Sequence, residues 1–162
     1  MALAQRGSVY AKVAIGWMHE TGAGLARDQE RARNHYLDAA KSGHPLAQFY
    51  LGLLSRRAGR YEEAYAWFRD AATQAYAPAL YRLGWAYHAG EGVDRDLSRA
   101  ADCFRQASRQ GHIFGMREVA LRMLRGREGL ASIPNGLYLY IKAMVSGVVL
   151  AARNPKSERL LG

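Results

Sequence analysis

The chain has 162 residues, of which 49% are hydrophobic and 23% charged, and its 23 basic and 14 acidic side chains give a net charge of +9. This length and composition are typical of a single globular domain with a buried core. The single cysteine, Cys103, excludes an intramolecular disulfide and a cysteine-rich zinc site. Arginines supply most of the positive charge, but the total alone does not identify a nucleic-acid binder, which concentrates its charge on one face.

An internal repeat runs along most of the chain. A small residue is followed four positions later by an apolar residue and then a second small residue, and this pattern recurs at spacings of 36, 32 and 36 residues. The apolar–small pairs are Ile15 and Gly16, Leu51 and Gly52, Leu83 and Gly84, and Val119 and Ala120. An aromatic residue with an alanine three positions later also recurs, at Tyr36 and Ala39, Phe68 and Ala71, Phe104 and Ala107, and Tyr140 and Ala143. The sequence therefore predicts one domain of four repeats and a C-terminal cap or tail, over residues 11–46, 47–78, 79–114, 115–150 and 151–162.

Each repeat is predicted to be a pair of helices, because apolar and small residues recur at helical spacing in both halves and strand-like alternation is scarce. Glycines mark the turn inside each pair, at Gly22 and Gly24, Gly59, Gly90 and Gly92, and Gly126 and Gly129. The expected N-caps of the second helices are Asp28, Asp96 and Ser132. The residues expected to end the second helices are Gly43, Gly111 and Gly147, with Ala75 as the exception.

Small residues also recur where the two helices of a pair must approach each other closely. These positions are Gly16, Gly52, Gly84 and Ala120 on the first helices, and Ala39, Ala71, Ala107 and Ala143 on the second. A single pair cannot bury its apolar face, so the pairs are expected to stack on one another and share a continuous core. The predicted fold is therefore all-α, a right-handed α-α superhelix, or solenoid, of four helix pairs.

Residues 83–112, LGWAYHAGEGVDRDLSRAADCFRQASRQGH, resemble the Sel1-like repeat, a helical repeat related to the tetratricopeptide repeat but with a longer G-x-G-V turn. The resemblance extends over residues 11–150 and is strongest in the first and third repeats. The second repeat lacks the second turn glycine, and the fourth has Gly136 in place of alanine. The resemblance implies a non-enzymatic scaffold for protein interactions, and bacterial relatives serve exopolysaccharide, cell-envelope or signalling systems.

The resemblance to tetratricopeptide repeats also implies that the first helices line a concave groove that binds a protein or peptide partner. The residues projected into this groove are Tyr10, Val13, Trp17, Phe49, Leu53, Arg56, Arg57, Tyr81, Trp85, His88, Phe114, Arg117, Leu121 and Arg125. Other residues in the same columns are Glu20, Leu46, Pro78 and Leu124. The groove is mainly apolar and aromatic with arginines along one edge, so the expected partner is an apolar or aromatic segment that carries acidic residues.

The aromatic residues of these helices have a second interpretation as core. Rings at helical spacing pack between helices as readily as they line a groove, so the sequence leaves both roles open for Trp17 and Trp85. Trp67 lies on a second helix beside Phe68 and is predicted to be core.

An alternative function is polyanion or nucleic-acid binding through the arginine-rich C-terminal half. The candidate residues are Arg105, Arg109, Arg117, Arg122, Arg125 and Arg127. Helical geometry scatters these six over several faces, and few aromatic residues interleave with them for base stacking. The sequence therefore favours a solvated basic surface, and nucleic acid is the less favoured partner.

No residue pattern predicts catalysis, a cofactor or a metal site. The five histidines form no HExxH motif, and His44 and His112 each follow a helix-ending glycine, where they are expected to complete a turn. Cys103 precedes the core residue Phe104 and is expected to be a buried hydrophobic residue instead of a nucleophile. We therefore expect a protein that is not an enzyme.

The two ends of the chain give expectations about location and assembly. Residues 1–17 lack the pattern of a signal peptide, and the longest apolar run, 143–152, is about half of the ~20 residues that a membrane span needs. We therefore expect a cytoplasmic protein with no membrane span. Residues after 147 are expected to extend the last helix as a cap and to end it at Asn154 and Pro155. Neither end has a strongly polar cover, so a homo-oligomer formed through the solenoid ends is a further expectation.

Overall fold

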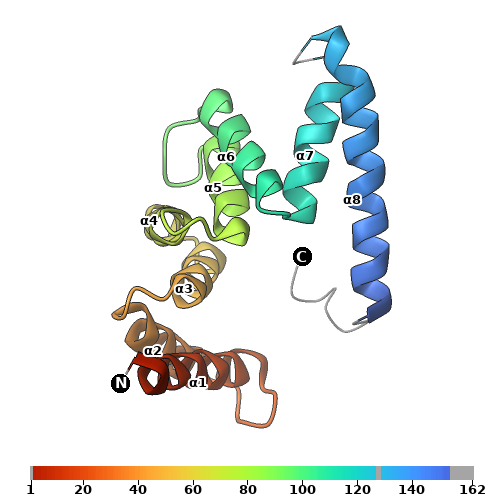
Figure 1. Ribbon diagram of the computed structural model, residues 1–162. Helices are drawn as coiled ribbons and strands as arrows, with labels where there is room; N and C mark the ends of the chain where they lie inside the picture. The colour runs from red at the N-terminus through yellow and green to blue at the C-terminus, as the bar shows by residue number, and fades with distance from the viewer. Residues whose placement is uncertain (1, 127–128, 154–162) are drawn as a thin grey trace.

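A computed structural model describes residues 2–126 and 129–153, and within these ranges the ordered elements are eight α-helices and one short 3-10 helix. The elements are α1 (Ala2–Thr21), α2 (Gln29–Ala40), α3 (Pro45–Arg57), α4 (Tyr61–Ala72), α5 (Ala77–Ala89), α6 (Leu97–Arg109), α7 (Ile113–Leu124), η1 (Leu130–Ser132) and α8 (Ile133–Arg153). They follow one another along a curved path from α1 and α2 to α7 and α8 (Figure 1).

The helices form four consecutive pairs, α1 with α2, α3 with α4, α5 with α6, and α7 with α8. Successive pairs are joined because each of the second helices α2, α4 and α6 also packs against the first helix of the next pair. This arrangement confirms the predicted all-α solenoid of helix pairs. It leaves the first helices of neighbouring repeats next to one another, so that their side chains form a shared surface.

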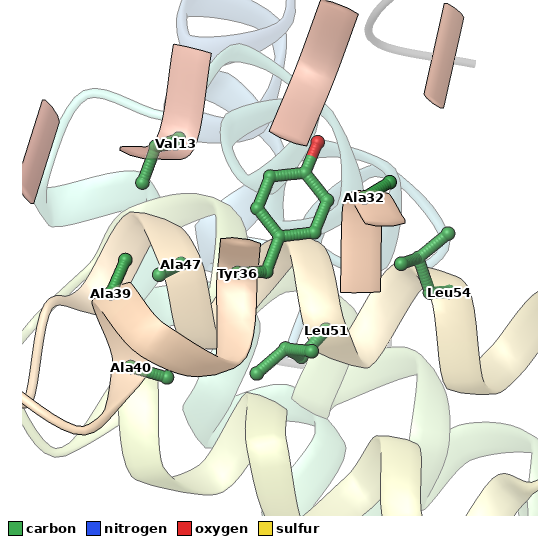
Figure 2. Packing of buried hydrophobic residues seen from close by; sticks show 8 residues of the cluster. All are labelled: Val13, Ala32, Tyr36, Ala39, Ala40, Ala47, Leu51 and Leu54. Atoms are coloured by element: carbon green, nitrogen blue, oxygen red, sulfur yellow. The ribbon is translucent and has the colours of Figure 1, made fainter. Parts of the chain in front are cut away.

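Glycines on the first helices allow the aromatic residue of the second helix to pack directly on the backbone. A Cβ atom at Gly52 would lie 2.5 Å from Cε1 of Phe68, and one at Gly84 would lie 2.6 Å from Cε1 of Phe104. Tyr36 occupies the same place in the first pair and is fully buried among the core residues of α1, α2 and α3 (Figure 2). The prediction that small residues mark the close approach within a pair is therefore confirmed.

Side-chain caps begin the helices, and residues with a positive φ end them, at most of the predicted positions. The carboxylates of Asp28 and Asp96 accept hydrogen bonds from the first backbone N–H groups of α2 and α6. Gly90 ends α5 with a φ of 76°. The second turn glycine has a different role, because a Cβ atom at Gly92 would lie 2.2 Å from the carbonyl oxygen of Tyr61, at the start of α4. The turn of the third pair therefore lies against the second pair.

One of the two predictions for the last pair is wrong. Ser132 stands directly before α8, at the predicted N-cap position, and its hydroxyl donates a hydrogen bond to the carbonyl oxygen of Gly129 at 2.6 Å. Gly147 does not end the second helix, because α8 continues to Arg153. The apolar residues around Gly147 keep the helical pattern, and a single glycine costs only about 1 kcal/mol within a helix. The expected extension of the last helix is thus present, and its predicted end at residues 154–155 lies outside the described residues.

Candidate functional site

Two cavities lie next to each other along α5. The first has a volume of about 240 Å³ and lies between α3, α4 and α5. The second has a volume of about 150 Å³ and lies between α3, α5 and α7. Tyr81 and Arg82 line both cavities. Pro78, near the start of α5, lines the second cavity, whereas Trp85 and Ala89, nearer its end, line the first. We call the two cavities together the α5 groove.

Aromatic rings that pack on one another form the wall of the α5 groove. The ring of Tyr81 lies 4.9 Å from that of His112, 5.8 Å from that of Phe104 and 5.9 Å from that of Phe114. The ring of Trp85 lies 5.8 Å from Phe104 and also lines the first cavity. Trp85 therefore combines the two roles that the sequence left open, because it packs against the core and faces the groove.

Arg82 is half-buried at the point where the two cavities meet. Its guanidinium makes no hydrogen bond or ion pair with any residue that the structure describes. Burial, followed by the charge of Arg56, lowers the pKa of Arg82, but a guanidinium keeps its charge at neutral pH. The groove therefore presents a positive charge whose planar N–H donors suit a carboxylate.

The two neighbouring arginines on α3 are already engaged. Arg56 donates two hydrogen bonds to the carboxylate of Glu91, at 2.7 and 3.0 Å. Arg57 pairs with Glu20, a buried carboxylate that also accepts a hydrogen bond of 2.8 Å from the hydroxyl of Tyr36. Both arginines were predicted to bind the partner, and in the structure each pairs with a carboxylate of a neighbouring repeat.

His112 contributes no positive charge to the groove at neutral pH. It occupies the N-cap position of α7, where its Nδ1 accepts a hydrogen bond of 3.2 Å from the backbone N–H of Gly115. Burial, followed by the charge of Arg82, lowers the pKa of His112 to about 4. His44 has the equivalent position at the start of α3, but its side chain makes no capping hydrogen bond. The prediction that a histidine completes the turn is therefore confirmed for His112.

The structure brings together only part of the predicted groove. The predicted residues that line the α5 groove are Phe49, Arg56, Tyr81, Trp85 and Phe114. Those that line neither cavity are Tyr10, Val13, Trp17, Leu53, Arg57, His88, Arg117, Leu121 and Arg125. Val13 is wrong as a binding residue, because it is only 4% exposed and packs within the core of the first repeat. Glu20, from the same columns, is likewise buried.

The sequence prediction missed several residues of the groove. These are Arg82 and the tyrosines Tyr50, Tyr61, Tyr65 and Tyr76. A signal for two of them was available, because Tyr50 and Arg82 share one repeat column with Ala14 and Glu118, next to the projected column of Phe49 and Tyr81. That column mixes charged, aromatic and small residues, which is not the pattern of a core position.

A third cavity, of about 470 Å³, lies between α2 and α4 on the surface of the second helices. Its charged residues are paired, since the carboxylate of Asp38 contacts Lys41 at 3.0 Å and Lys12 at 3.5 Å. Trp67 lines this cavity and also packs against the core of the first repeat, so the predicted core residue lies at the edge of the core. The α5 groove, with its unpaired Arg82, is the stronger candidate for a binding site.

The arginines of the alternative site do not form one stripe. They lie on α6, on α7 and in the turn after α7, and Arg127 lies outside the described residues. Arg105 pairs with Asp102, and Arg117 pairs with Glu118 at 3.1 Å. This scatter and pairing agree with the sequence preference for a solvated basic surface.

The single thiol, the distribution of metal-ligating side chains and the apolar character of the helices bear on chemistry and membrane insertion. Burial, followed by the charge of Asp102, raises the pKa of Cys103 to about 11, so this buried thiol stays protonated at neutral pH. Within residues 2–126 and 129–153, no three histidine, cysteine, aspartate or glutamate side chains lie close enough together to hold a metal ion. None of the helices in these ranges has the length and apolar character needed to cross a membrane.

The repeated helix pairs, their stacking and their shared groove define a helical repeat module. The Sel1 repeat family profile matches residues 9–44, 45–76 and 77–112, and the chain therefore belongs to the Sel1 repeat family. Each matched repeat begins two residues before the repeat predicted from the sequence. Helices α7 and α8 form a further pair that lies outside the matched residues.

Known proteins similar to this chain come from animals, fungi and bacteria. The chain is 33% identical over 89 residues to mouse DAP3-binding cell death enhancer 1 and 32% identical over 83 residues to chitin synthase regulatory factor 4 of Schizosaccharomyces pombe. These matches cover 52% and 51% of this chain but only 17% and 13% of the two relatives.

Two solved bacterial structures have the same fold. The Sel1 repeat protein of Oxalobacter formigenes superimposes with a TM-score of 0.77 and 26% identity, over 86% of this chain and 58% of its own. The protective antigen c5321 of uropathogenic Escherichia coli strains superimposes with a TM-score of 0.74 and 25% identity, over 89% of this chain and 32% of its own. The chain thus spans only part of each similar protein.

Proposed function

We propose that this protein is a non-enzymatic adaptor that binds a segment of a protein partner in the α5 groove. The observation that carries the proposal is the pair of aromatic cavities that meet at Arg82. Aromatic and arginine side chains supply most of the binding energy in protein interfaces, and here both kinds converge on one groove. The names of the two curated relatives, one DAP3-binding and one a regulatory factor, fit a module that contacts other proteins.

The position of the groove supports an adaptor role. It is built from α3, α4, α5 and α7, so three successive repeats contribute to one binding surface. Solenoids use such surfaces, which extend across repeats, to hold segments of other proteins. The bacterial envelope, exopolysaccharide or signalling systems expected from the resemblance remain part of this proposal.

A steric block of the first cavity tests the proposal. Ala89 is exposed and lines that cavity at the end of α5, so an Ala89→Trp substitution fills the cavity without changing the core. The matched control is Gln106→Trp, at an exposed position of α6. Peptides are selected from a random display library on the natural protein, and their affinities are then measured by fluorescence anisotropy.

We expect the selected peptides to bind the control variant as tightly as the natural protein and to bind Ala89→Trp at least about tenfold more weakly, a loss of about 1.4 kcal/mol. Equal binding by Ala89→Trp would contradict the proposal. A second result would also contradict the proposal. If no peptides are selected and a single-stranded oligonucleotide binds tightly with a strong dependence on salt, the polyanion alternative is favoured.

A further inference from the structure

Arg82 stands out among the charged residues of the α5 groove because the local carboxylates are already used. Glu91 receives both hydrogen bonds of Arg56. Glu20 is bound by Arg57 and by the hydroxyl of Tyr36. Three arginines therefore share two carboxylates at this end of α3 and α5. The arginines therefore exceed the carboxylates by one, and the arginine without a carboxylate partner is Arg82.

We propose that Arg82 binds the carboxylate of one internal aspartate or glutamate in the partner segment, with an apolar residue of the segment in the cavity on each side. This inference rests on the proposed function and names the chemistry that the groove selects. A guanidinium binds a carboxylate through two parallel N–H···O bonds, and such charge-assisted pairs are about twice as strong as neutral hydrogen bonds.

The geometry of the groove favours an internal acidic residue over a chain end. The second cavity extends from Arg82 toward Pro78, and the first extends from Arg82 toward Ala89. A ligand that fills both cavities must therefore continue on both sides of its carboxylate. A C-terminal carboxylate has chain on one side only and would leave one cavity empty.

The length of the groove sets the spacing of the ligand residues. Pro78 and Ala89 are eleven residues apart on α5, which is about 16 Å along a helix. An extended peptide covers that distance with about five residues, and its alternate side chains point to the same face. The expected pattern is thus apolar, any residue, acidic, any residue, apolar. The larger apolar residue is expected in the first cavity, whose volume of about 240 Å³ exceeds the 150 Å³ of the second.

The charge also distinguishes a carboxylate from a phosphate. A phosphorylated side chain carries a charge of about −1.5 to −2 at neutral pH and is best matched by a cluster of arginines. The other arginine that lines the first cavity, Arg56, already has both of its hydrogen bonds on Glu91. One available guanidinium matches one carboxylate.

The test compares peptides selected on two forms of the protein. The probe is a display library of seven random residues held between glycine–serine flanks, so that no displayed segment has a free end in the groove. One form is the natural protein, and the other carries Arg82→Gln, with circular dichroism and thermal unfolding to check its fold. The matched control is Arg69→Gln, an exposed arginine on α4 that lines neither cavity.

We expect the natural protein and the control to enrich an acidic residue flanked two positions away by apolar residues, and Arg82→Gln to lose the acidic preference. In a synthetic peptide with blocked ends, replacing the acid by its amide should weaken binding to the natural protein by about tenfold to a hundredfold. The same replacement should change binding to Arg82→Gln by less than about threefold, because the coupled pair is already broken.

Acidic preference that persists in Arg82→Gln would overturn the inference, as would a preference for peptides with a free C-terminal carboxylate or a phosphoserine. Peptides that bind and are blocked by Ala89→Trp but never discriminate acid from amide would overturn the inference while leaving the proposed function in place. Arg82→Lys keeps the charge but lacks the planar fork, and we expect it to retain only part of the discrimination.

Discussion

The glycines of the first helices are the residues on which the packing of each helix pair depends. Gly52 faces the ring of Phe68, which is only 2% exposed and has no room to move away. A side chain at Gly52 would therefore displace the ring or separate the two helices. Gly147, in the last helix, has no such neighbour, because a Cβ atom there would lie 3.9 Å from Cγ2 of Ile113.

This difference gives opposite expectations for one substitution. Gly52→Ala should lower the free energy of unfolding by about 1 kcal/mol or more, because overpacking costs about 1–3 kcal/mol. Gly147→Ala should raise it by up to about 1 kcal/mol, because alanine favours the helix and fits the available space. Urea unfolding of both variants measures the two changes, and a stabilised Gly52→Ala variant would contradict the packing described here.

His112 is expected to make the stability of the fold depend on pH. Its pKa is lowered from 6.5 to about 4 by burial and by the charge of Arg82, so the unfolded chain binds the proton more tightly than the folded one. The stabilisation is therefore complete above pH 6.5 and is lost as the pH falls from 6.5 toward 4.

A His112→Asn variant isolates this effect. The asparagine side chain retains an oxygen that can cap α7 but has no proton to gain. Between pH 6.5 and 4.5 the free energy of unfolding of this variant should fall less steeply than that of the natural protein. Urea unfolding at a series of pH values measures both slopes, and identical slopes would show that His112 is not responsible.

Interactions between elements determine how one repeat is positioned on the next. The end of α1 is tied to α2 and to α3 by Glu20, which is 8% exposed and bonds to Tyr36 and Arg57. Burial, followed by the charge of Glu20, raises the pKa of Tyr36 far above its ordinary value. The end of α3 is tied to the turn after α5 by Arg56 and Glu91. In both cases an arginine of α3 holds a carboxylate of a neighbouring repeat.

The bond between Tyr36 and Glu20 is expected to stabilise the first two repeats cooperatively. Tyr36→Phe should lower the free energy of unfolding by about 1 kcal/mol, and Glu20→Gln by about 1–3 kcal/mol, since it alters a buried group with two partners. The double variant should lose less than the sum of the two, because both changes break one bond. Strict additivity in a double-mutant cycle, measured by urea unfolding, would contradict this coupling.

The sequence was enough to predict the helix pairs, because their determinants recur at fixed spacing. Gly16, Gly52 and Gly84 recur, each with its own aromatic partner, and each determines a contact within one pair; the partners are Tyr36, Phe68 and Phe104. Gly147 misled because the apolar pattern around it continues the helix, and a glycine at the expected position does not by itself determine where a helix ends.

The binding site was less predictable because it depends on contacts between repeats. Arg57 and Glu20 are 37 residues apart and meet only when the stacking geometry is known. The sequence therefore could not show that Arg56 and Arg57 pair with carboxylates or that Arg82 does not. Val13 was misplaced although it shares its repeat column with Phe49 and Tyr81, because in the first repeat this position is packed into the core and only 4% exposed.

At the scale of the whole molecule, the last helix has an unusual surface. Residues on one side of α8 are apolar and at least half exposed, namely Leu137, Tyr138, Ile141, Met144, Val145 and Val148. The position in α6 equivalent to Leu137 is Ala101, which is 3% exposed and lies on a helix that packs against α7 of the next pair. The face of α8 thus continues the series of interfaces between repeats.

Self-association through a solenoid end stays a prediction, and this face is where we expect it. A second copy of the chain is expected to cover the apolar residues of α8, with a dissociation constant in the micromolar range for a modest interface of this kind. Val148→Asp should shift the protein to monomer in analytical ultracentrifugation. Thr73→Asp, on the exposed end of α4, is the control and should leave the distribution unchanged. A natural protein that is monomeric at all concentrations would contradict this prediction.

The most direct test of the account is to locate the bound peptide by NMR. A selected peptide with a central acidic residue is titrated into the isotopically labelled protein, and backbone amide shifts are followed residue by residue. The account predicts saturable shifts along α5, centred on Tyr81, Arg82 and Trp85, that disappear in Ala89→Trp. Shifts confined to the cavity between α2 and α4, or to the arginines of α6 and α7, would show that the α5 groove is not the binding site.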